Sequence, residues 1–425
     1  MMKLTQKPSL PNPKDVYRVA LSNGITVLAR SSFSSPSISM GGYLPAGSIF
    51  ETDDKLGLAD FVSSCLMRGT KSRTFDSIYN ELESVGASLG IDSNVHNVNF
   101  GGRSLVEDFP LLLTLLSESL RFPTFPKKEV ENLRAHMLTG LALREQDTSD
   151  MAALVFDRTL FKGHPYSRPT DGFVETVQSI TRKDMSEFHR HYFGPKGMVI
   201  AIVGAIEPQK AVETVERILG GWQVPGQALP PPLPKPKTVK KTVRHHHHVP
   251  GKSQSDLVVG MIGPSRKDPG YFAASLANSI LGQFGMMGRI GDVVREKSGL
   301  AYYASSNLNA GIGPGSWEVS AGVNPQNLEK AIDLIEKELW RFIRNGVTKE
   351  ELAENQANYI GRLPLSLESN SGVAGALLNM ERYNLGLDYY QRYESMVRGV
   401  TRADVLKTVR KYITPDRLVI STAGP

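Results

Sequence analysis

Short alternating stretches and longer helical stretches follow one another along the first half of the chain. Residues 16–30 alternate around an Asn-Gly pair, the strongest short-range signal for a β-hairpin. Residues 87–103 alternate in the manner of paired strands. Apolar residues recur at helical spacing in residues 74–85, 110–122 and 127–146, with a threonine at the first of these starts to cap the helix.

The second half contains the same mixture of segments. Strands are predicted at 257–261, 302–307 and 317–323, and helices at 269–281, near 293 and at 328–345. Runs of strands followed by runs of helices are typical of α+β domains. We therefore expect a mostly antiparallel sheet with helices packed on one face in each half of the chain.

An internal repeat explains this likeness. ITRKDMSEFHRHYFGPKGMVIAIVG, from residue 180, matches VTRADVLKTVRKYITPDRLVISTAG, from residue 400, at a constant offset of 220. In each copy a threonine caps a helix with an aspartate in its first turn, and an apolar strand follows. A weaker match at an offset of 222 lies upstream and aligns Ser149 and Ala152 with Ser371 and Ala374. Such self-similarity at a fixed period indicates a duplicated domain.

A proline-rich segment separates the two copies. Six prolines fall between residues 225 and 236, a composition typical of an extended, stiff connector. The sequence therefore predicts an N-terminal domain at 1–224, a linker at 225–240 and a homologous C-terminal domain at 241–425.

Composition excludes several classes of protein. The chain has 425 residues, of which 40% are hydrophobic and 22% charged, so it is not a disordered chain. The net charge of +6 is spread along the chain without a dense basic block, which argues against a nucleic-acid binder. A single cysteine, Cys65, excludes a disulfide scaffold and is expected to be a buried structural thiol. No secretory signal and no membrane span is recognisable, so a cytoplasmic location is expected.

Residues 57–70, GLADFVSSCLMRGT, resemble the segment GLAHFLEHMLFKGT of the pitrilysin/insulinase metallopeptidases, the inverzincins. The preceding YLPAGSIFET, the HPY triplet at 164, PGKSQSD at 250 and VREKSGLAYY at 294 also resemble family signatures. The resemblance extends over nearly the whole chain in the same order. It implies the pair of homologous domains that the internal repeat indicates, and it points to the processing-peptidase branch.

The zinc-binding residues of that family are replaced in this chain. The family's HxxEH places two zinc ligands and a general base on one helix, and a glutamate further along is the third ligand. The corresponding positions here are Asp60, Ser63, Ser64 and Gly140. Serine is a poor zinc ligand and one carboxylate cannot hold the ion, so no metal is expected there. An improvised site of Asp60 with His136, near His96, is the alternative.

Four consecutive histidines occupy residues 245–248. In an extended strand His245 shares a face with His247, and His246 shares the other face with His248, so each pair could hold a metal ion. The other interpretation is a polar start to a strand after the linker, because two ligands alone make a weak site.

Arg295 and Tyr302 resemble an Arg/Tyr pair that the family keeps in the half of the molecule opposite the zinc. The resemblance implies that they donate hydrogen bonds to a substrate carbonyl and its developing oxyanion, in trans with a partner. Fixed donors aimed at developing charge stabilise a transition state. The structural alternative is an arginine held in a salt bridge and a tyrosine filling a sheet.

A peptide-binding sheet edge is expected in the N-terminal domain. Strand addition uses backbone donors and acceptors and requires no metal. The alternating stretch before Arg103 and the family resemblance place this edge at five residues: His96, Asn97, Val98, Asn99 and Phe100.

These observations favour a non-catalytic, substrate-binding subunit of a heterodimeric zinc metallopeptidase. The resemblance implies a homologous partner that bears HxxEH and holds the zinc, and peptide substrates; this chain needs no cofactor of its own. Two alternatives stay open: a structural core or scaffold subunit, and a peptide-binding protein without a role in proteolysis.

Overall fold

The computed structural model describes residues 10–285 and 288–425, which form two compact units. The first unit comprises residues up to Leu141, Pro169–Pro232 and Leu363–Arg392. The second comprises Ala142–Arg168, Leu233–Arg362 and Tyr393–Pro425.

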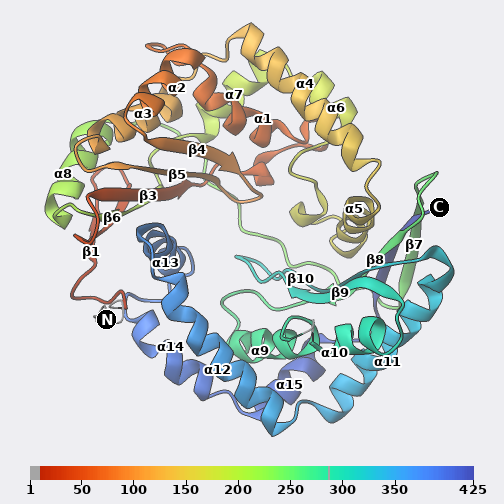
Figure 1. Ribbon diagram of the computed structural model, residues 1–425. Coiled ribbons are helices and arrows are strands. Elements are labelled where there is room, and N and C mark those ends of the chain that lie inside the picture. The colour runs from red at the N-terminus through yellow and green to blue at the C-terminus, as the bar shows by residue number, and fades with distance from the viewer. Residues whose placement is uncertain (1–9, 286–287) are drawn as a thin grey trace. The chain divides into compact units, whose positions relative to one another are not determined.

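A six-stranded mixed sheet forms the centre of the first unit, in the order β1-β2-β6-β3-β5-β4 (Figure 1). Its strands are β1 (Tyr17–Ala20), β2 (Thr26–Ser31), β3 (Ser37–Leu44), β4 (Ser88–Ser93), β5 (Val98–Leu105) and β6 (Val199–Gly204). The predicted hairpin is confirmed, because β1 pairs antiparallel with β2 across a turn in which Gly24 has a positive φ of 95°. Only β2 and β6 pair in parallel; the other pairings between the described strands of this sheet are antiparallel.

Helices lie on both faces of this sheet. The described helices of this unit are α1 (Leu58–Cys65), α2 (Phe75–Ser84), α3 (Phe109–Arg121), most of α4 (Lys127–Arg144), α6 (Val174–Ser179), α7 (Arg182–Tyr192), α8 (Pro208–Leu219) and α13 (Asn370–Arg382). Ile38 and Met40 of β3 point into the core that α1 and α3 share. Gly41 points to the opposite face, where an added Cβ would lie 3.3 Å from Leu378 of α13. The sheet is therefore buried between two helical layers.

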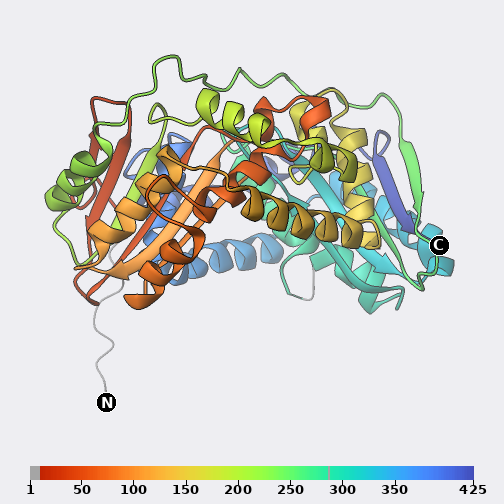
Figure 2. The ribbon, with the colours of Figure 1, turned by 90° about the horizontal axis from the view of Figure 1, so that it is seen from above.

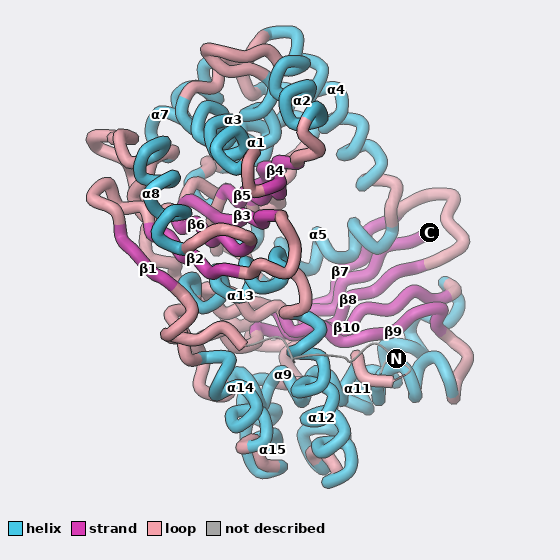
Figure 3. The backbone as a smooth tube through the Cα atoms, turned by 60° about the vertical axis from the view of Figure 1, so that its left-hand side comes forward, coloured by secondary structure: helices cyan, strands magenta, loops and turns pink. Residues whose placement is uncertain are grey.

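The second unit has a five-stranded sheet in the order β7-β11-β8-β10-β9, whose strands lie side by side in Figure 3. The strands are β7 (Val243–His248), β8 (Ser255–Ile262), β9 (Ala301–Leu308), β10 (Ser316–Val323) and β11 (Val419–Gly424). Strand β7 pairs in parallel with β11, and the other described pairs are antiparallel. The sheet reproduces the order of the first one without a counterpart of β1, as a duplication predicts.

Helices also cover both faces of the second sheet. The described helices are α5 (Thr148–Leu160), α9 (Tyr271–Gly282), α10 (Gly288–Gly291), the π-helical turn Asp292–Glu296, α11 (Leu328–Asn345), most of α12 (Lys349–Ser366), most of α14 (Tyr389–Arg398) and α15 (Arg402–Tyr412). Leu257 and Val259 of β8 join the core shared with α9 and α11. Val258 faces the other way and packs in the cluster that contains Phe156 of α5.

The two sequence repeats exchange one helix. Helix α5 belongs to the first half of the chain but packs on β8 and β11, and α13 belongs to the second half but packs on β3 and β6. Ser149 of α5 and Ser371 of α13 are equivalent by the 222-residue offset. The α+β class with two mostly antiparallel sheets is confirmed, and the structure adds this one exchanged helix to the second face of each sheet.

Local signals place the repeated helices correctly. Thr181 and Thr401 each cap a helix by accepting from the backbone N–H of Asp184 and Asp404, and each aspartate accepts from the threonine N–H in return. This reciprocal capping satisfies two N–H groups that a helix leaves unpaired. Residues 225–240 contain no helix or strand and follow an extended path (Figure 2). No helix of the described ranges is long and apolar enough to cross a membrane.

Candidate functional site

Helix α1 holds the positions of the altered zinc motif. It begins after Gly57, whose φ of 91° is left-handed, and a Cβ there would lie 2.9 Å from the carbonyl oxygen of Asp171. The buried carboxylate of Glu51 accepts hydrogen bonds from the N–H groups of Gly57 (3.2 Å) and Ala59 (2.7 Å). A carboxylate at a helix N-terminus is stabilised by the helix dipole. The segment of the altered motif therefore forms a helix whose N-terminus Glu51 stabilises.

Asp60 lies in the first turn of α1 and is half-buried. Burial, followed by the negative charges of Asp171 and Asp92, raises the pKa of its carboxyl to about 6. The neighbouring Ser63 is 1% exposed, and its hydroxyl donates to the backbone carbonyl of Asp60 at 3.0 Å. Burial and like charges both favour the protonated form of a carboxyl group, so Asp60 exchanges its proton close to neutral pH.

The residues present do not fit a zinc ion. Gly140 contributes no donor, and an added Cβ would meet nothing within 4 Å. His136, one turn earlier on α4, is exposed. No three His, Cys, Asp or Glu side chains gather in a metal-binding arrangement anywhere in residues 10–285 and 288–425. The improvised site therefore lacks the three ligands that tetrahedral zinc requires.

Cys65 ends the same helix. Its side chain is fully buried, and burial raises the pKa of its thiol to about 12. The thiolate is the reactive form of cysteine, so this thiol is inert at neutral pH. The expected structural role is confirmed.

Arg295 and Tyr302 lie in the second unit, on the π-helical turn and at the start of β9. Tyr302 is 87% exposed. The Arg295 side chain is 37% exposed, and its Nε lies 3.7 Å from the carboxylate of Glu296, beyond hydrogen-bonding distance. Tyr302 does not fill the sheet, whereas Arg295 does form a loose ion pair with Glu296, as the structural alternative expects.

The next residue, Tyr303, points to the opposite face of β9 and has a different role. Its hydroxyl donates to Asp256 at 2.6 Å, and burial followed by this hydrogen bond raises the pKa of the phenol well above its usual range. Asp256 also accepts from Thr148 at the start of α5 (2.5 Å) and from Gln254. This buried network fixes α5 to the sheet, and no local sequence signal indicated it.

The expected sheet edge at residues 96–100 is corrected by the topology. Strand β5, which holds Val98, Asn99 and Phe100, pairs with β3 on one side and with β4 on the other. His96 and Asn97 precede it in the turn after β4, and Val98, Phe100 and Asn97 are buried. The outermost strand on this side of the described sheet is β4, beside α1. Alternation identified both strands, but it carries no information on which of them is outermost.

A hydrogen-bonded chain connects this edge to α13. The side-chain amide of Asn99 donates to Asp92 of β4 at 2.9 Å, and Arg382 donates to the Asn99 carbonyl oxygen at 3.1 Å. The Arg382 guanidinium also stacks over the ring of Tyr43, 4.4 Å from its centroid. The register of the edge is therefore tied to the helix on the second face.

Two carboxyl groups, one on α5 and one on β10, interact through their charges. Asp157 of α5 is affected by burial and by the charge of Glu318 on β10, which together raise its pKa to about 7. Burial also raises the pKa of Glu318, although the hydroxyl of Ser316 donates to it at 2.5 Å. Asp157 and Glu318 are 161 residues apart in the sequence, so no local sequence pattern predicts that they interact.

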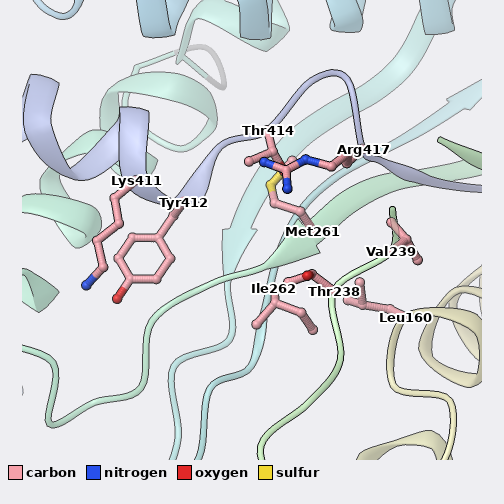
Figure 4. Close-up of a pocket in the computed structure, with 9 residues that line it drawn as sticks. All are labelled: Leu160, Thr238, Val239, Met261, Ile262, Lys411, Tyr412, Thr414 and Arg417. Carbon is pink, nitrogen blue, oxygen red and sulfur yellow. The ribbon is translucent and has the colours of Figure 1, made fainter. Parts of the chain in front are cut away.

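Each unit contains a cavity that lies apart from the predicted site residues. One of about 270 Å³ in the second unit has apolar walls and is shown in Figure 4; its lining is Leu160, Thr238, Val239, Met261, Ile262, Lys411, Tyr412, Thr414 and Arg417. Lys411 and the Tyr412 hydroxyl are engaged by Asp268. The other, of about 780 Å³ in the first unit, lies between β3, β5 and the start of α13.

Comparisons with known proteins agree with this geometry. Residues 26–172 match the model of insulinase, peptidase family M16, and residues 179–359 match the model of the peptidase M16 inactive domain. An uncharacterized zinc protease of Streptomyces coelicolor is 27% identical over 86% of this chain and 79% of its own length. Human mitochondrial cytochrome b-c1 complex subunit 1 is 27% identical over 62% of this chain and 55% of its own length.

Solved structures share the whole fold. A crystal structure of a peptidase M16 inactive domain from Pseudomonas fluorescens has a TM-score of 0.89 and 27% identity, covering 97% of this chain and 98% of that one. A protease from Helicobacter pylori has the same fold, with a TM-score of 0.90 at 21% identity, covering 98% of this chain and 100% of that one.

Fold and site together define a two-domain protein of the zinc-peptidase type in which the residues of the zinc motif are replaced. The chain belongs to peptidase family M16.

Proposed function

We propose that this chain is the non-catalytic, substrate-binding subunit of a heterodimeric zinc metallopeptidase. A homologous partner that bears HxxEH supplies the zinc and the general base. This chain supplies part of the peptide-binding surface together with Arg295 and Tyr302, whose hydrogen bonds stabilise the oxyanion in the partner's active site. The complex acts in the cytoplasm.

The exposure of Tyr302 is the observation that carries this proposal. A tyrosine with 87% of its surface exposed contributes little to packing, and its hydroxyl is accessible to a group outside the chain. The Arg295 side chain is also accessible, and it lies beside the adjacent, solvent-facing Glu296. Two accessible donors on one segment suit a charge that another molecule presents.

The altered motif on α1 supports a division of labour. Asp60, Ser64 and Gly140 provide one carboxylate, one hydroxyl and no donor at the family's zinc positions, and Ser63 stands where the family has its general base. Hydrolysis by this chain alone is therefore not expected, and a zinc ion has to come with the partner. Peptide contact requires only backbone groups, for which the edge strand β4 is suited.

The test is the substitution Tyr302→Phe in the purified complex. It removes one hydroxyl and little volume, so assembly should be unchanged. Loss of one oxyanion donor lowers kcat by about 10²–10³, which corresponds to about 3–4 kcal/mol. Because Arg295 acts on the same charge, the double variant Arg295→Ala/Tyr302→Phe should lose less than the sum of the two single effects.

Tyr17→Phe is the matched control, because Tyr17 is also exposed, at 41%, and lies on β1 of the other unit. It should leave kcat and KM unchanged. Unchanged kcat and KM in the Tyr302→Phe complex would refute the donor role.

A scaffold role is the second candidate. The similarity to cytochrome b-c1 complex subunit 1, over 62% of this chain, favours it. In that case the chain assembles with its partners, and Tyr302→Phe changes neither assembly nor any activity of the complex.

A further inference from the structure

The histidine run lies on an edge strand. Strand β7 contains residues 245–248 and has β11 as its single strand neighbour in the described part of the second sheet. Its equivalent in the first sheet, β2, has a parallel neighbour too, but β1 covers the outer edge of that strand. The outer side of β7 is therefore accessible, and three of the four histidines are exposed while His247 is partly buried.

The contacts on either side of β7 assign each histidine to a face. Arg244 forms ion pairs with Glu329 (2.8 Å) and Glu336 (3.8 Å) of α11, so even-numbered residues lie on the α11 side. Val249 is buried in the cluster that contains Phe156, so odd-numbered residues lie on the α5 side. Successive side chains of a strand alternate between faces. His246 and His248 therefore share the α11 side.

A hydrogen bond orients the ring of His246. Its Nδ1 lies 2.9 Å from the hydroxyl oxygen of Thr422 on β11. The single hydroxyl proton of Thr422 is directed to the carbonyl oxygen of His245, at 3.4 Å. In the arrangement in which Thr422 accepts from His246, the proton is on Nδ1 and the lone pair is on Nε2. Histidines that bind metals are oriented in this way, with one ring nitrogen donating to a neighbour and the other available to the ion.

We infer that His246 and His248 chelate a divalent transition metal ion through their imidazole nitrogens, with Cu²⁺ bound most tightly. Residues two apart in a strand lie about 6.6 Å from each other on one side, which lets two imidazoles converge on an ion at about 2 Å from each nitrogen. Affinity of nitrogen ligands rises through the series to Cu²⁺ and falls again at Zn²⁺.

The surrounding charge is compatible with a cation. Arg244 lies two residues before His246 on the same side of β7, so its positive charge is the one on this strand that would repel a bound cation. Two carboxylates of α11, those of Glu329 and Glu336, neutralise it. Water completes the coordination. The site is independent of the proposed function and of the motif on α1.

The experiment is calorimetric titration of the full chain with Cu²⁺ alone, combined with electron paramagnetic resonance of the bound ion. We expect one tight equivalent with two nitrogen ligands. The double variant His246→Gln/His248→Gln should lower the affinity at least tenfold. The matched control His245→Gln/His247→Gln removes the same number of imidazoles from the other face and should keep the tight equivalent.

Thr422→Val tests the orientation of His246 with no ligand removed. Loss of such a supporting hydrogen bond typically weakens metal binding about 10–100-fold, so affinity should fall by about tenfold or more. Equal losses in the two double variants, or a wild-type chain that binds Cu²⁺ no more tightly than His246→Gln/His248→Gln, would overturn the inference.

Discussion

Replacing Asp157 by asparagine removes one of the two carboxyl groups, on α5 and β10, that interact through their charges. The pKa of Asp157 is raised from 3.8 to about 7 by burial and by the charge of Glu318. A raised carboxyl pKa means that the folded chain binds more protons than the unfolded chain between these two values. The wild-type chain therefore loses stability as the pH rises from about 4 to about 7, and the cost then stays constant at higher pH.

The size of this cost follows from the same values. The difference between 3.8 and about 7 corresponds to about 4 kcal/mol in the free energy of unfolding. The substituted asparagine would keep the shape of the side chain, but its amide still needs hydrogen-bond partners in a half-buried place. We therefore expect Asp157→Asn to gain about 2 kcal/mol at pH 8 and almost nothing at pH 4.

Thermal unfolding of both chains between pH 4 and pH 8 measures this difference. The midpoint of Asp157→Asn should rise above that of the wild type progressively with pH. Asp333→Asn is the control, because Asp333 is an exposed acid on α11 of the same unit. A constant difference between Asp157→Asn and the wild type across this range would refute the reasoning.

Two further predictions concern the motif on α1 and the repeated helix caps. A variant that rebuilds the family's zinc motif combines Asp60→His, Ser63→Glu, Ser64→His and Gly140→Glu. It should bind zinc, because α1 is a helix over the motif and a side chain at position 140 has open space around it. After dialysis it should retain one zinc more than the wild type, and the version that keeps Gly140 should bind more weakly; a folded variant with no additional zinc would contradict this. Thr401→Ala should lower the free energy of unfolding by about 1 kcal/mol in denaturant titrations, since the cap of α15 is lost, and an unchanged value would show that Asp404 alone suffices.

Elements with a local cause could be predicted from the sequence. The capping threonines, the Asn-Gly turn and the amphipathic stretch at α11 gave correct positions, because each depends on residues within one or two turns. The exposure of Tyr302 beside the half-buried Tyr303 also follows from alternation along β9, although the sequence does not say which of the two faces is covered.

Arrangements made over long distances in the chain could not be predicted. Nothing in the amphipathic pattern of α5 or α13 states which sheet it covers, so the exchange of helices between the repeats was not foreseen. The prediction that residues 96–100 form the sheet edge was wrong for the same reason, since β4 is the outermost strand there. The raised pKa of Asp60 depends first on burial and then on the charges of Asp171 and Asp92, which come from two other parts of the chain. Such pairings become visible only when the chain is folded.

The zinc content of each subunit of the native complex tests the central claim most directly. The complex is purified without an affinity tag, and the subunits are separated before metal analysis. In this chain residues 245–248 are replaced by glutamine, so that any zinc found on it is bound at the α1 position. We predict one zinc per complex, all of it with an HxxEH-bearing partner, and peptide hydrolysis by the complex but not by this chain alone. Stoichiometric zinc on this chain, or peptide hydrolysis by this chain without a partner, would contradict the account.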